Sequence, residues 1–132
     1  MIFGIGTDVL RLDRVERVWE HYGDAFARRI LLDEELALFG RSKNKTRFLA
    51  MRFAAKEAIV KAMGTGFANG VWVRDVGTVP NALGQPQVIY SARGLAMCDR
   101  LGIGSGFLTL SDEAGLVVAI AILLRRSPEE RA

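Results

Sequence analysis

Residues 52–66, which read Arg-Phe-Ala-Ala-Lys-Glu-Ala-Ile-Val-Lys-Ala-Met-Gly-Thr-Gly, are the most informative stretch of this chain. They place Glu57 between Lys56 and Lys61 on a predicted helix of otherwise small and apolar residues, followed by the Gly64-Thr65-Gly66 turn. The alanines have little bulk, so a ligand can approach the backbone closely. Charged groups in such surroundings are costly unless they have partners. The pattern therefore predicts a site for a polyanion carrying a divalent metal, such as a nucleotide-like phosphate compound.

The helix that contains this stretch is expected to run from about Asn44 to Met63. At 100° per residue, its apolar residues fall into two groups on different sides. The first group is a core-facing stripe of Phe48, Met51, Ala55, Ala58, Ile59 and Ala62, and the second is a patch of Leu49, Phe53 and Val60. A helix buried on two sides leaves Glu57 and Lys61 pointing outward between the two groups.

Helices are predicted mainly in the first half of the chain and strands in the second. Asp13 is expected to open a helix, with Glu16 as its capping-box partner, and Gly23 to end it. The other predicted elements are a strand over 1–7, a short helix from Asp33, strands over 71–79 and 87–90, a helix from Ser91 to 101–102, and a hairpin of strands 107–111 and 116–124. This order predicts an α+β fold in which residues 1–132 form a single domain, with helices packed on a mainly antiparallel sheet. Open strand edges in so small a sheet make a homo-oligomer plausible.

The composition is that of an ordinary globular protein, with half of its 132 residues apolar and a quarter charged. The longest apolar run, Leu116 to Leu124, has nine residues, too few to cross a bilayer. Cys98 is the only cysteine, which excludes an internal disulfide, fits a reducing cytoplasm and favours an inert packing role. A single histidine and a single cysteine also exclude a zinc cluster, so a hard, oxygen-bound ion such as Mg²⁺ is the expected metal.

The net charge of +3 is unevenly distributed. Residues 11–61 contain twelve Arg and Lys against eight Asp and Glu, a balance of +4, and the remainder contains six against seven. This bias indicates an acidic ligand or partner, and nucleic acid, an anionic membrane and an acidic protein are all compatible with it. Five arginines, at positions 11, 14, 17, 28 and 29, gather around the first predicted helix. They are either a solvated surface or a docking surface for an acidic partner.

Two carboxylates are candidate metal ligands. Asp8 follows Gly4-Ile5-Gly6-Thr7 at the end of the first predicted strand, where it could bind a metal or cap a turn. Glu57 could be half of an i,i+4 pair with Lys61, but burial of the helix on two sides favours a functional role. Together the two acids could bind Mg²⁺, which also takes water and substrate phosphate oxygens.

Phosphate groups could be bound by Lys56, Lys61 and free backbone N–H groups of the turn at 64–66. Thr109 and Ser111 share one face of the penultimate strand and could contact a ligand, although a plain polar outer face is the simpler interpretation.

Several segments of the chain resemble the holo-[acyl-carrier-protein] synthases, the short class of 4′-phosphopantetheinyl transferases. The matching residues are 4–8, Arg14, 26–31, 52–58 and 61–66, in order over nearly the whole chain. The resemblance implies the 4′-phosphopantetheinyl transferase fold and a role in fatty acid biosynthesis. The implied reaction is Mg²⁺-dependent transfer of 4′-phosphopantetheine from coenzyme A to a serine of acyl carrier protein, with release of adenosine 3′,5′-bisphosphate.

The resemblance also implies roles for individual residues. Asp8 and Glu57 would bind Mg²⁺, and Lys61 with Lys56 would meet the pyrophosphate. Contacts with coenzyme A would come from Arg52, Gly64, Thr65, Gly66, Gly84, Pro86, Thr109 and Ser111. Arg14, Arg28 and Arg29 would receive the acidic recognition helix of the carrier protein. Short members of the family are trimers with active sites at subunit interfaces.

The chain departs from the family pattern at Phe107, because many relatives have a histidine at the start of His-x-Ser-x-Ser/Thr in this strand. Phenylalanine cannot hydrogen-bond to a phosphate or a carbonyl group. The acceptor of the serine proton stays open between Glu57 and a metal-bound water.

Two other functions were weighed, a basic nucleic-acid-binding protein and a non-catalytic adaptor for an acidic protein. The first requires aromatic residues exposed among the basic ones, whereas the aromatic residues here fit buried positions. The second gives no reason for Asp8, Glu57 and Lys61 to occur together. Neither nucleic acid nor a membrane is therefore expected as a partner.

Overall fold

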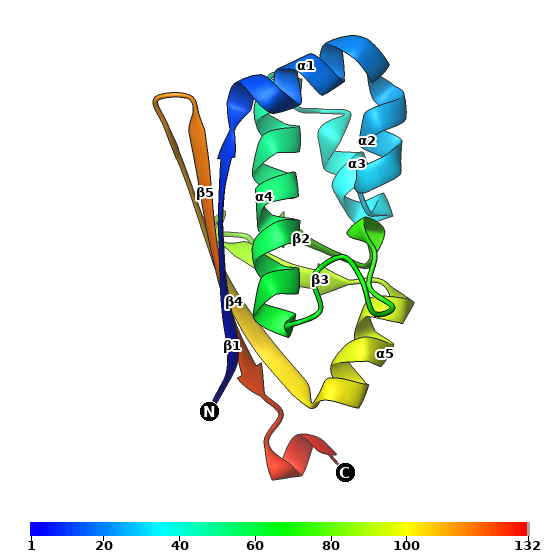
Figure 1. Cartoon of the computed structure of the whole chain (residues 1–132), viewed down its shortest axis with the longest axis vertical. Coiled ribbons are helices and arrows are strands. Elements are labelled where there is room, and N and C mark those ends of the chain that lie inside the picture. The colour runs from blue at the N-terminus through cyan, green and yellow to red at the C-terminus, as the bar shows by residue number, and fades with distance from the viewer. Residues whose placement is uncertain (132) are drawn as a thin grey trace.

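The computed structural model describes residues 1–131 as a mixed α/β fold of helices and antiparallel sheets (Figure 1). The elements in chain order are β1 (Ile2–Arg11), α1 (Leu12–Tyr22), α2 (Asp24–Ile30), α3 (Asp33–Phe39), α4 (Lys45–Met63), η1 (Val73–Asp75), β2 (Val76–Pro80), β3 (Pro86–Tyr90), α5 (Ala92–Leu101), β4 (Ile103–Glu113), β5 (Leu116–Arg125) and η2 (Pro128–Arg131). Strands β1, β5 and β4 form an antiparallel sheet in that order, and β2 pairs with β3 in a second antiparallel sheet. The predicted α+β class is confirmed, with two small sheets in place of the single one expected.

Helix α4 is the centre of the fold. It packs along β1 and β5 and also contacts β2 and α1, so it lies between the three-stranded sheet and the N-terminal helices (Figure 1). Residues of both predicted apolar groups, such as Leu49, Ala55 and Ile59, are 0% exposed, which confirms burial on two sides. The helix ends are the predicted ones. The side chain of Asn44 accepts a hydrogen bond from the Arg47 N–H, and Gly64 closes the helix in the left-handed conformation (φ 81°).

Glycines allow β1 to lie directly on α4. A Cβ atom at Gly6 would be 2.0 Å from the carbonyl oxygen of Ala58, and one at Gly4 would be 1.9 Å from that of Ala62. Only residues without a side chain fit at these positions. The alternation of glycine along β1 therefore sets the distance between this strand and the helix that carries Glu57.

The first part of the chain differs from the prediction in two respects. Strand β1 continues to Arg11, so Asp8 lies within the strand, paired with Ala119, and not beyond its end. Helix α1 begins at Leu12 with no side-chain cap, so the predicted Asp13 cap is wrong. Asp13 instead pairs with Arg11 at 2.7 Å, and its charge lies in the first turn, where it complements the helix dipole.

The bounds of other helices and strands also differ from the predicted ones. Gly23 ends α1 as expected, but α2 follows immediately and was not predicted. The segment predicted as a strand over 71–79 contains the 3₁₀ turn η1 before β2 begins at Val76. The Ser91 cap of α5 and the β4–β5 hairpin are confirmed.

The outer face of the three-stranded sheet is exposed and largely apolar, interrupted by the hydroxyl side chains of Thr7, Thr109 and Ser111. Its large apolar residues include Ile5 and Val9, each 61% exposed, Phe107 at 56% and Ile120 at 41%. No element among residues 1–131 covers this face. None of the helices in this part of the chain is long and apolar enough to cross a membrane.

Candidate active site

Asp8, Glu57 and Lys61 come together where β1 crosses α4. Asp8 points to the same side of β1 as Gly6 and Leu10, which face the helix, and its side chain is only 15% exposed. The Lys61 ammonium group lies 3.2 Å from Asp8 Oδ1 and donates a hydrogen bond to the Thr7 carbonyl at 3.0 Å. Burial and, after it, the negative charge of Asp8 raise the pKa of the Glu57 carboxyl, and Lys61 opposes this shift. The two predicted acids are thus close enough to repel each other.

This pair of acids has the donor chemistry that Mg²⁺ requires. Both supply hard carboxylate oxygens, and a cation between them would relieve their repulsion. Among residues 1–131 no group of three or more His, Cys, Asp or Glu side chains could hold a metal. Two carboxylates suit an ion that completes its coordination with water and substrate phosphate, so the residues fit Mg²⁺ arriving together with a phosphate compound.

The turn at residues 64–66 does not offer free N–H groups, and this part of the prediction is wrong. The Gly64 N–H donates to the Lys61 carbonyl, and those of Thr65 and Gly66 both donate to the Val60 carbonyl. These bonds satisfy the carbonyl groups at the end of α4. The turn has open space above Gly64 and Gly66, so it can lie against a ligand but cannot bind phosphate with these N–H groups.

Lys56 is not placed to bind phosphate, and this prediction is also wrong. Its side chain is 0% exposed, and its ammonium group lies 2.6 Å from Glu35 Oε1. Burial lowers the pKa of Lys56, and the charge of Glu35 opposes the shift. Sequence analysis missed Glu35, although one signal existed: Lys56 lies three residues after Phe53 and four before Val60, within the second apolar patch.

A second group of predicted residues lines a cavity of about 410 Å³ beside β4. Its lining residues are Met51, Arg52, Thr78, Pro80, Gly84, Gln85, Pro86, Leu108, Thr109 and Leu110. The structure thus brings Arg52, Gly84, Pro86 and Thr109 together, while Ser111 lies two residues further along β4, outside the cavity. The Arg52 guanidinium group stacks on Phe48 at 4.0 Å, and its Nε atom and the Thr78 hydroxyl are buried without a hydrogen-bond partner. Two residues that line one cavity thus each carry a buried polar atom without a hydrogen-bond partner, which marks the wall of this cavity as polar.

The acid cluster and this cavity lie at opposite edges of the three-stranded sheet. Asp8 is on edge strand β1, whereas Thr109 is on the other edge strand, β4. On α4, Arg52 and Glu57 are five residues apart, which corresponds to about 140° around the helix. One copy of the chain therefore presents the two groups on different sides.

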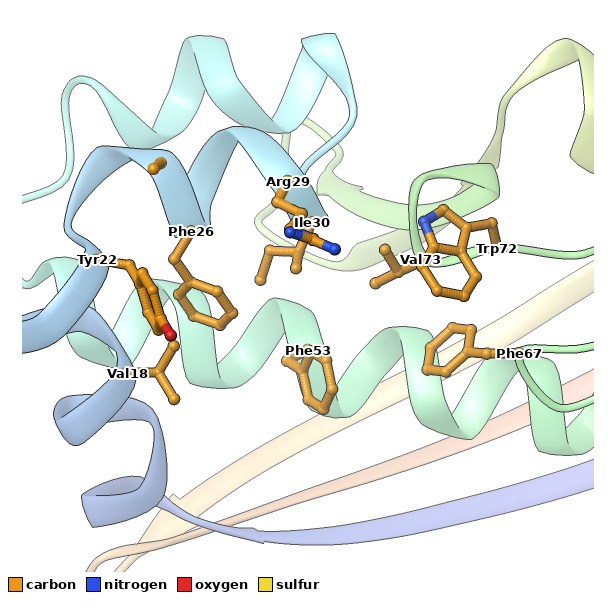
Figure 2. Close-up of a pocket in the computed structure, with 10 residues that line it drawn as sticks. Val18, Tyr22, Phe26, Arg29, Ile30, Phe53, Phe67, Trp72 and Val73 are labelled. Carbon is orange, nitrogen blue, oxygen red and sulfur yellow. The ribbon is translucent and has the colours of Figure 1, made fainter.

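Arg29, one of the three predicted partner-binding arginines, lines a largely apolar groove of about 560 Å³ (Figure 2). The groove is lined by Val18, Tyr22, Ala25, Phe26, Arg29, Ile30, Phe53, Phe67, Trp72 and Val73. Arg14 lines a smaller adjoining cavity that shares Val18, Phe26 and Phe53 with the groove. Arg28 instead faces a third cavity with Asp24 and Lys45. The structure thus brings Arg14 and Arg29 to one surface and separates Arg28 from them.

Known proteins are similar to this chain in both sequence and fold. The model of the 4′-phosphopantetheinyl transferase superfamily matches residues 4–121. The holo-[acyl-carrier-protein] synthase of Vibrio cholerae is 45% identical over 126 residues, which cover 96% of this chain and all of the relative. The crystal structure of the Neisseria meningitidis holo-[acyl-carrier-protein] synthase has a TM-score of 0.89 and 41% identity, over 95% of this chain and 100% of that one. That of the Bacillus anthracis enzyme, in complex with CoA (3′,5′-ADP), has a TM-score of 0.78 and 33% identity over 96% and 99%.

These matches span most of the chain and most of each relative. The chain belongs to the 4′-phosphopantetheinyl transferase superfamily and, within it, to the holo-[acyl-carrier-protein] synthases. The resemblance found in the sequence is confirmed.

Proposed function

We propose that this protein transfers 4′-phosphopantetheine from coenzyme A to a serine of apo-acyl carrier protein and releases adenosine 3′,5′-bisphosphate, with Mg²⁺ as the required ion. The observation that carries the proposal is the cluster of Asp8, Glu57 and Lys61 at the crossing of β1 and α4, in a chain of this family. The test is to incubate the protein with apo-acyl carrier protein, coenzyme A and Mg²⁺ and to measure the mass of the carrier protein. A cytoplasmic location is part of the proposal, because Cys98 is free and buried and free thiols are typical of reducing compartments. A role in fatty acid biosynthesis is also proposed, and membership of this family supports it.

In the proposed reaction, Asp8 and Glu57 hold Mg²⁺, which when bound neutralises charge on the diphosphate. The Lys61 ammonium group is at present paired with Asp8. Its side chain is 49% exposed, so its flexible stem can turn the charge toward a phosphate oxygen and stabilise the leaving bisphosphate. The serine proton passes to Glu57 or to a water beside it.

The cavity lined by Arg52, Thr78, Pro86 and Thr109 is proposed to take the adenosine end of coenzyme A. Because it lies on the far side of the chain from Asp8 and Glu57, a second copy must supply it to complete a site. The apolar outer face of the sheet supports such an assembly, since exposed apolar patches of this kind mark association surfaces. We propose a homotrimer with a site between each pair of neighbours.

Complementation between two inactive variants tests this assembly. Glu57→Gln and Arg52→Glu each damage a different half of the proposed site, so each alone is expected to have low activity. Co-expressed and purified together, they are expected to regain activity in about a quarter of the sites, those where an intact Glu57 meets an intact Arg52. Two Glu57→Gln chains carrying different tags serve as the control. A mixture no more active than its components would contradict a site shared between copies.

The groove beside Arg14 and Arg29 is proposed to receive the carrier protein. The arginines would pair with acidic side chains of its recognition helix, while Phe26, Phe53 and Trp72 offer an apolar surface to the helix side facing them. Trp72 is 53% exposed and Tyr22 60%, and large aromatic residues of this kind often anchor partners.

Reversing the charge of Arg14 is expected to weaken binding of the carrier protein about tenfold or more and to leave coenzyme A affinity within about twofold, because Arg14 lies near the groove and outside both groups assigned to the donor. Isothermal titration of Arg14→Glu with each ligand measures both effects. Arg100→Glu, an exposed charge reversal on α5, is the matched control. Equal losses of affinity for the carrier protein and for coenzyme A would contradict the proposal that the two ligands bind to separate surfaces.

A further inference from the structure

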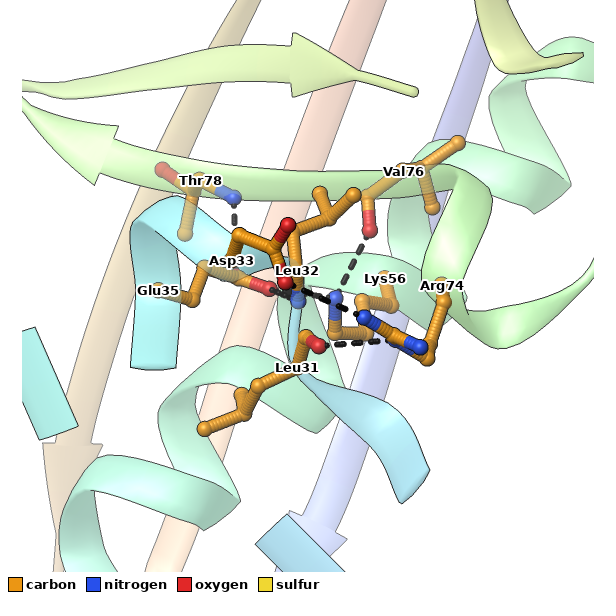
Figure 3. A network of polar contacts seen from close by, with 8 residues as sticks. All are labelled: Leu31, Leu32, Asp33, Glu35, Lys56, Arg74, Val76 and Thr78. Atoms are coloured by element: carbon orange, nitrogen blue, oxygen red, sulfur yellow. Dashed lines mark hydrogen bonds and ion pairs between the residues drawn. The ribbon is translucent and has the colours of Figure 1, made fainter. Parts of the chain in front are cut away.

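A fully buried ion pair joins α3, α4 and β2 (Figure 3). Glu35 and Lys56 are both 0% exposed, and Lys56 Nζ lies 2.6 Å from Glu35 Oε1. Oε1 also accepts a hydrogen bond from the Leu32 N–H at 3.0 Å, and Oε2 accepts one from the Thr78 N–H at 3.0 Å. Lys56 donates a further bond to the Val76 carbonyl at 2.7 Å. Both charges are thus hydrogen-bonded on several sides.

At the free edge of β2, the ion pair makes the hydrogen bonds that a neighbouring strand would otherwise make. Within residues 1–131 this strand pairs only with β3, so the Val76 carbonyl and the Thr78 N–H on its other edge need partners. The Lys56 ammonium group donates to the Val76 carbonyl, and the Glu35 carboxylate accepts from the Thr78 N–H. Gly77, between them, allows the close approach, because a Cβ there would be 2.8 Å from Glu35 Cδ. An apolar pair of equal volume would leave both backbone groups buried without a partner.

The same pair connects the two walls of the cavity assigned to coenzyme A. Arg52 lines the cavity from α4, one turn before Lys56. Thr78 lines it from β2, and its backbone N–H is the group that Glu35 holds. The unpartnered Arg52 Nε and Thr78 hydroxyl therefore belong to residues that the ion pair ties together. The acid cluster of Asp8 and Glu57 depends on β1 and α4 instead.

We propose that Glu35 and Lys56 are positioning residues for the donor-binding cavity, which hold β2 against α4 so that Arg52 and Thr78 keep their places in the two walls that receive coenzyme A. The proposal rests on the proposed function, because the ligand of the cavity is inferred from it. It assigns no contact between the ion pair and the substrate. The expected consequence is an effect on coenzyme A binding that is separate from the chemical step.

Glu35→Gln tests the proposal, with Glu34→Gln as a matched control on the exposed face of the same helix. Loss of the buried charge weakens the hold on β2, so the KM for coenzyme A is expected to rise about tenfold, while kcat at saturating coenzyme A stays within about twofold. Glu35→Asp, which keeps the charge, is expected to restore part of the affinity. Glu34→Gln is expected to leave both constants unchanged.

If Glu35→Gln does not fold, a measurement on the wild-type protein tests the proposal instead. Hydrogen exchange of the Thr78 amide is expected to slow on addition of coenzyme A by a larger factor than that of Cys98 on α5, because closing the cavity around a ligand suppresses opening of β2.

Two results would overturn the proposal: an unchanged KM in a folded Glu35→Gln variant, or no extra protection of Thr78 by bound coenzyme A. A wild-type protein that neither binds coenzyme A nor modifies the carrier protein would instead refute the proposed function.

Discussion

Glu57→Gln is expected to reduce turnover at least about a hundredfold while the protein stays folded. The amide has nearly the shape of the carboxylate but lacks its charge, so it is a poor ligand for Mg²⁺ and cannot accept the serine proton. Because Asp8 and Lys61 remain in place, their contact at 3.2 Å should persist. Rates of carrier-protein modification at saturating coenzyme A and Mg²⁺ measure the loss.

The stability of the same variant separates a functional role for Glu57 from a structural one. The pKa of Glu57 is raised in the folded protein, first by burial and then by Asp8. A group with a raised folded pKa favours folding while it is protonated, and this contribution is lost as the pH rises through the folded pKa. Without metal, Glu57→Gln is therefore expected to melt at a higher temperature than the wild type near pH 7. The difference should vanish below the pKa of an ordinary glutamate. A lower melting temperature near pH 7 would make Glu57 a structural residue.

Gly6→Ala is expected to destabilise the protein by about 3 kcal/mol or more and to remove most of its activity. The new Cβ would be 2.0 Å from the Ala58 carbonyl oxygen and 2.6 Å from the Ala62 nitrogen. These are backbone atoms of α4, so no side-chain rotation relieves the clash, and β1 must move away from the helix. The movement displaces Asp8 from Glu57, and displacements of about 1 Å in an active site can cost a hundredfold in rate. Urea unfolding and the transfer assay measure the two effects.

Gly40→Ala is the control for this substitution. Gly40 has helical backbone angles (φ −58°, ψ −26°), and the nearest atom to its added Cβ is 3.9 Å away. Little change in stability or activity is expected there. If Gly6→Ala were equally harmless, contact between β1 and α4 would not set the geometry of the site.

The sequence was most predictive where local physics decides the structure. The apolar periodicity of α4, the side chain of Asn44 and the glycine at position 64 give the bounds of the central helix, and each acts within one turn of its own position. Asp8 and Glu57 could be paired because each carboxylate stands out among small residues. The exposed pattern of Thr109 and Ser111 on β4 likewise follows from strict alternation along a strand.

Two of the differences from the prediction concern interactions between distant parts of the chain, and the third concerns the conformation of one turn. Lys56 was assigned to phosphate because a charged group among small and apolar residues needs a partner. Its partner is Glu35, which lies 21 residues earlier, and no spacing rule connects the two. The N–H groups of the turn at 64–66 are used by α4 itself, which becomes evident only from the conformation of the turn. The separation of Arg52 from Glu57 depends on strand order β1-β5-β4, and strand order cannot be read from local patterns.

The most direct test of the account is the intact mass of apo-acyl carrier protein after incubation with this protein, coenzyme A and Mg²⁺. The account predicts that the carrier protein gains one phosphopantetheine group, that adenosine 3′,5′-bisphosphate appears in equal amount, and that both are lost with Glu57→Gln or with a chelator. A carrier protein of unchanged mass, under conditions where the protein is folded and binds coenzyme A, would contradict the proposed transfer at Asp8, Glu57 and Lys61.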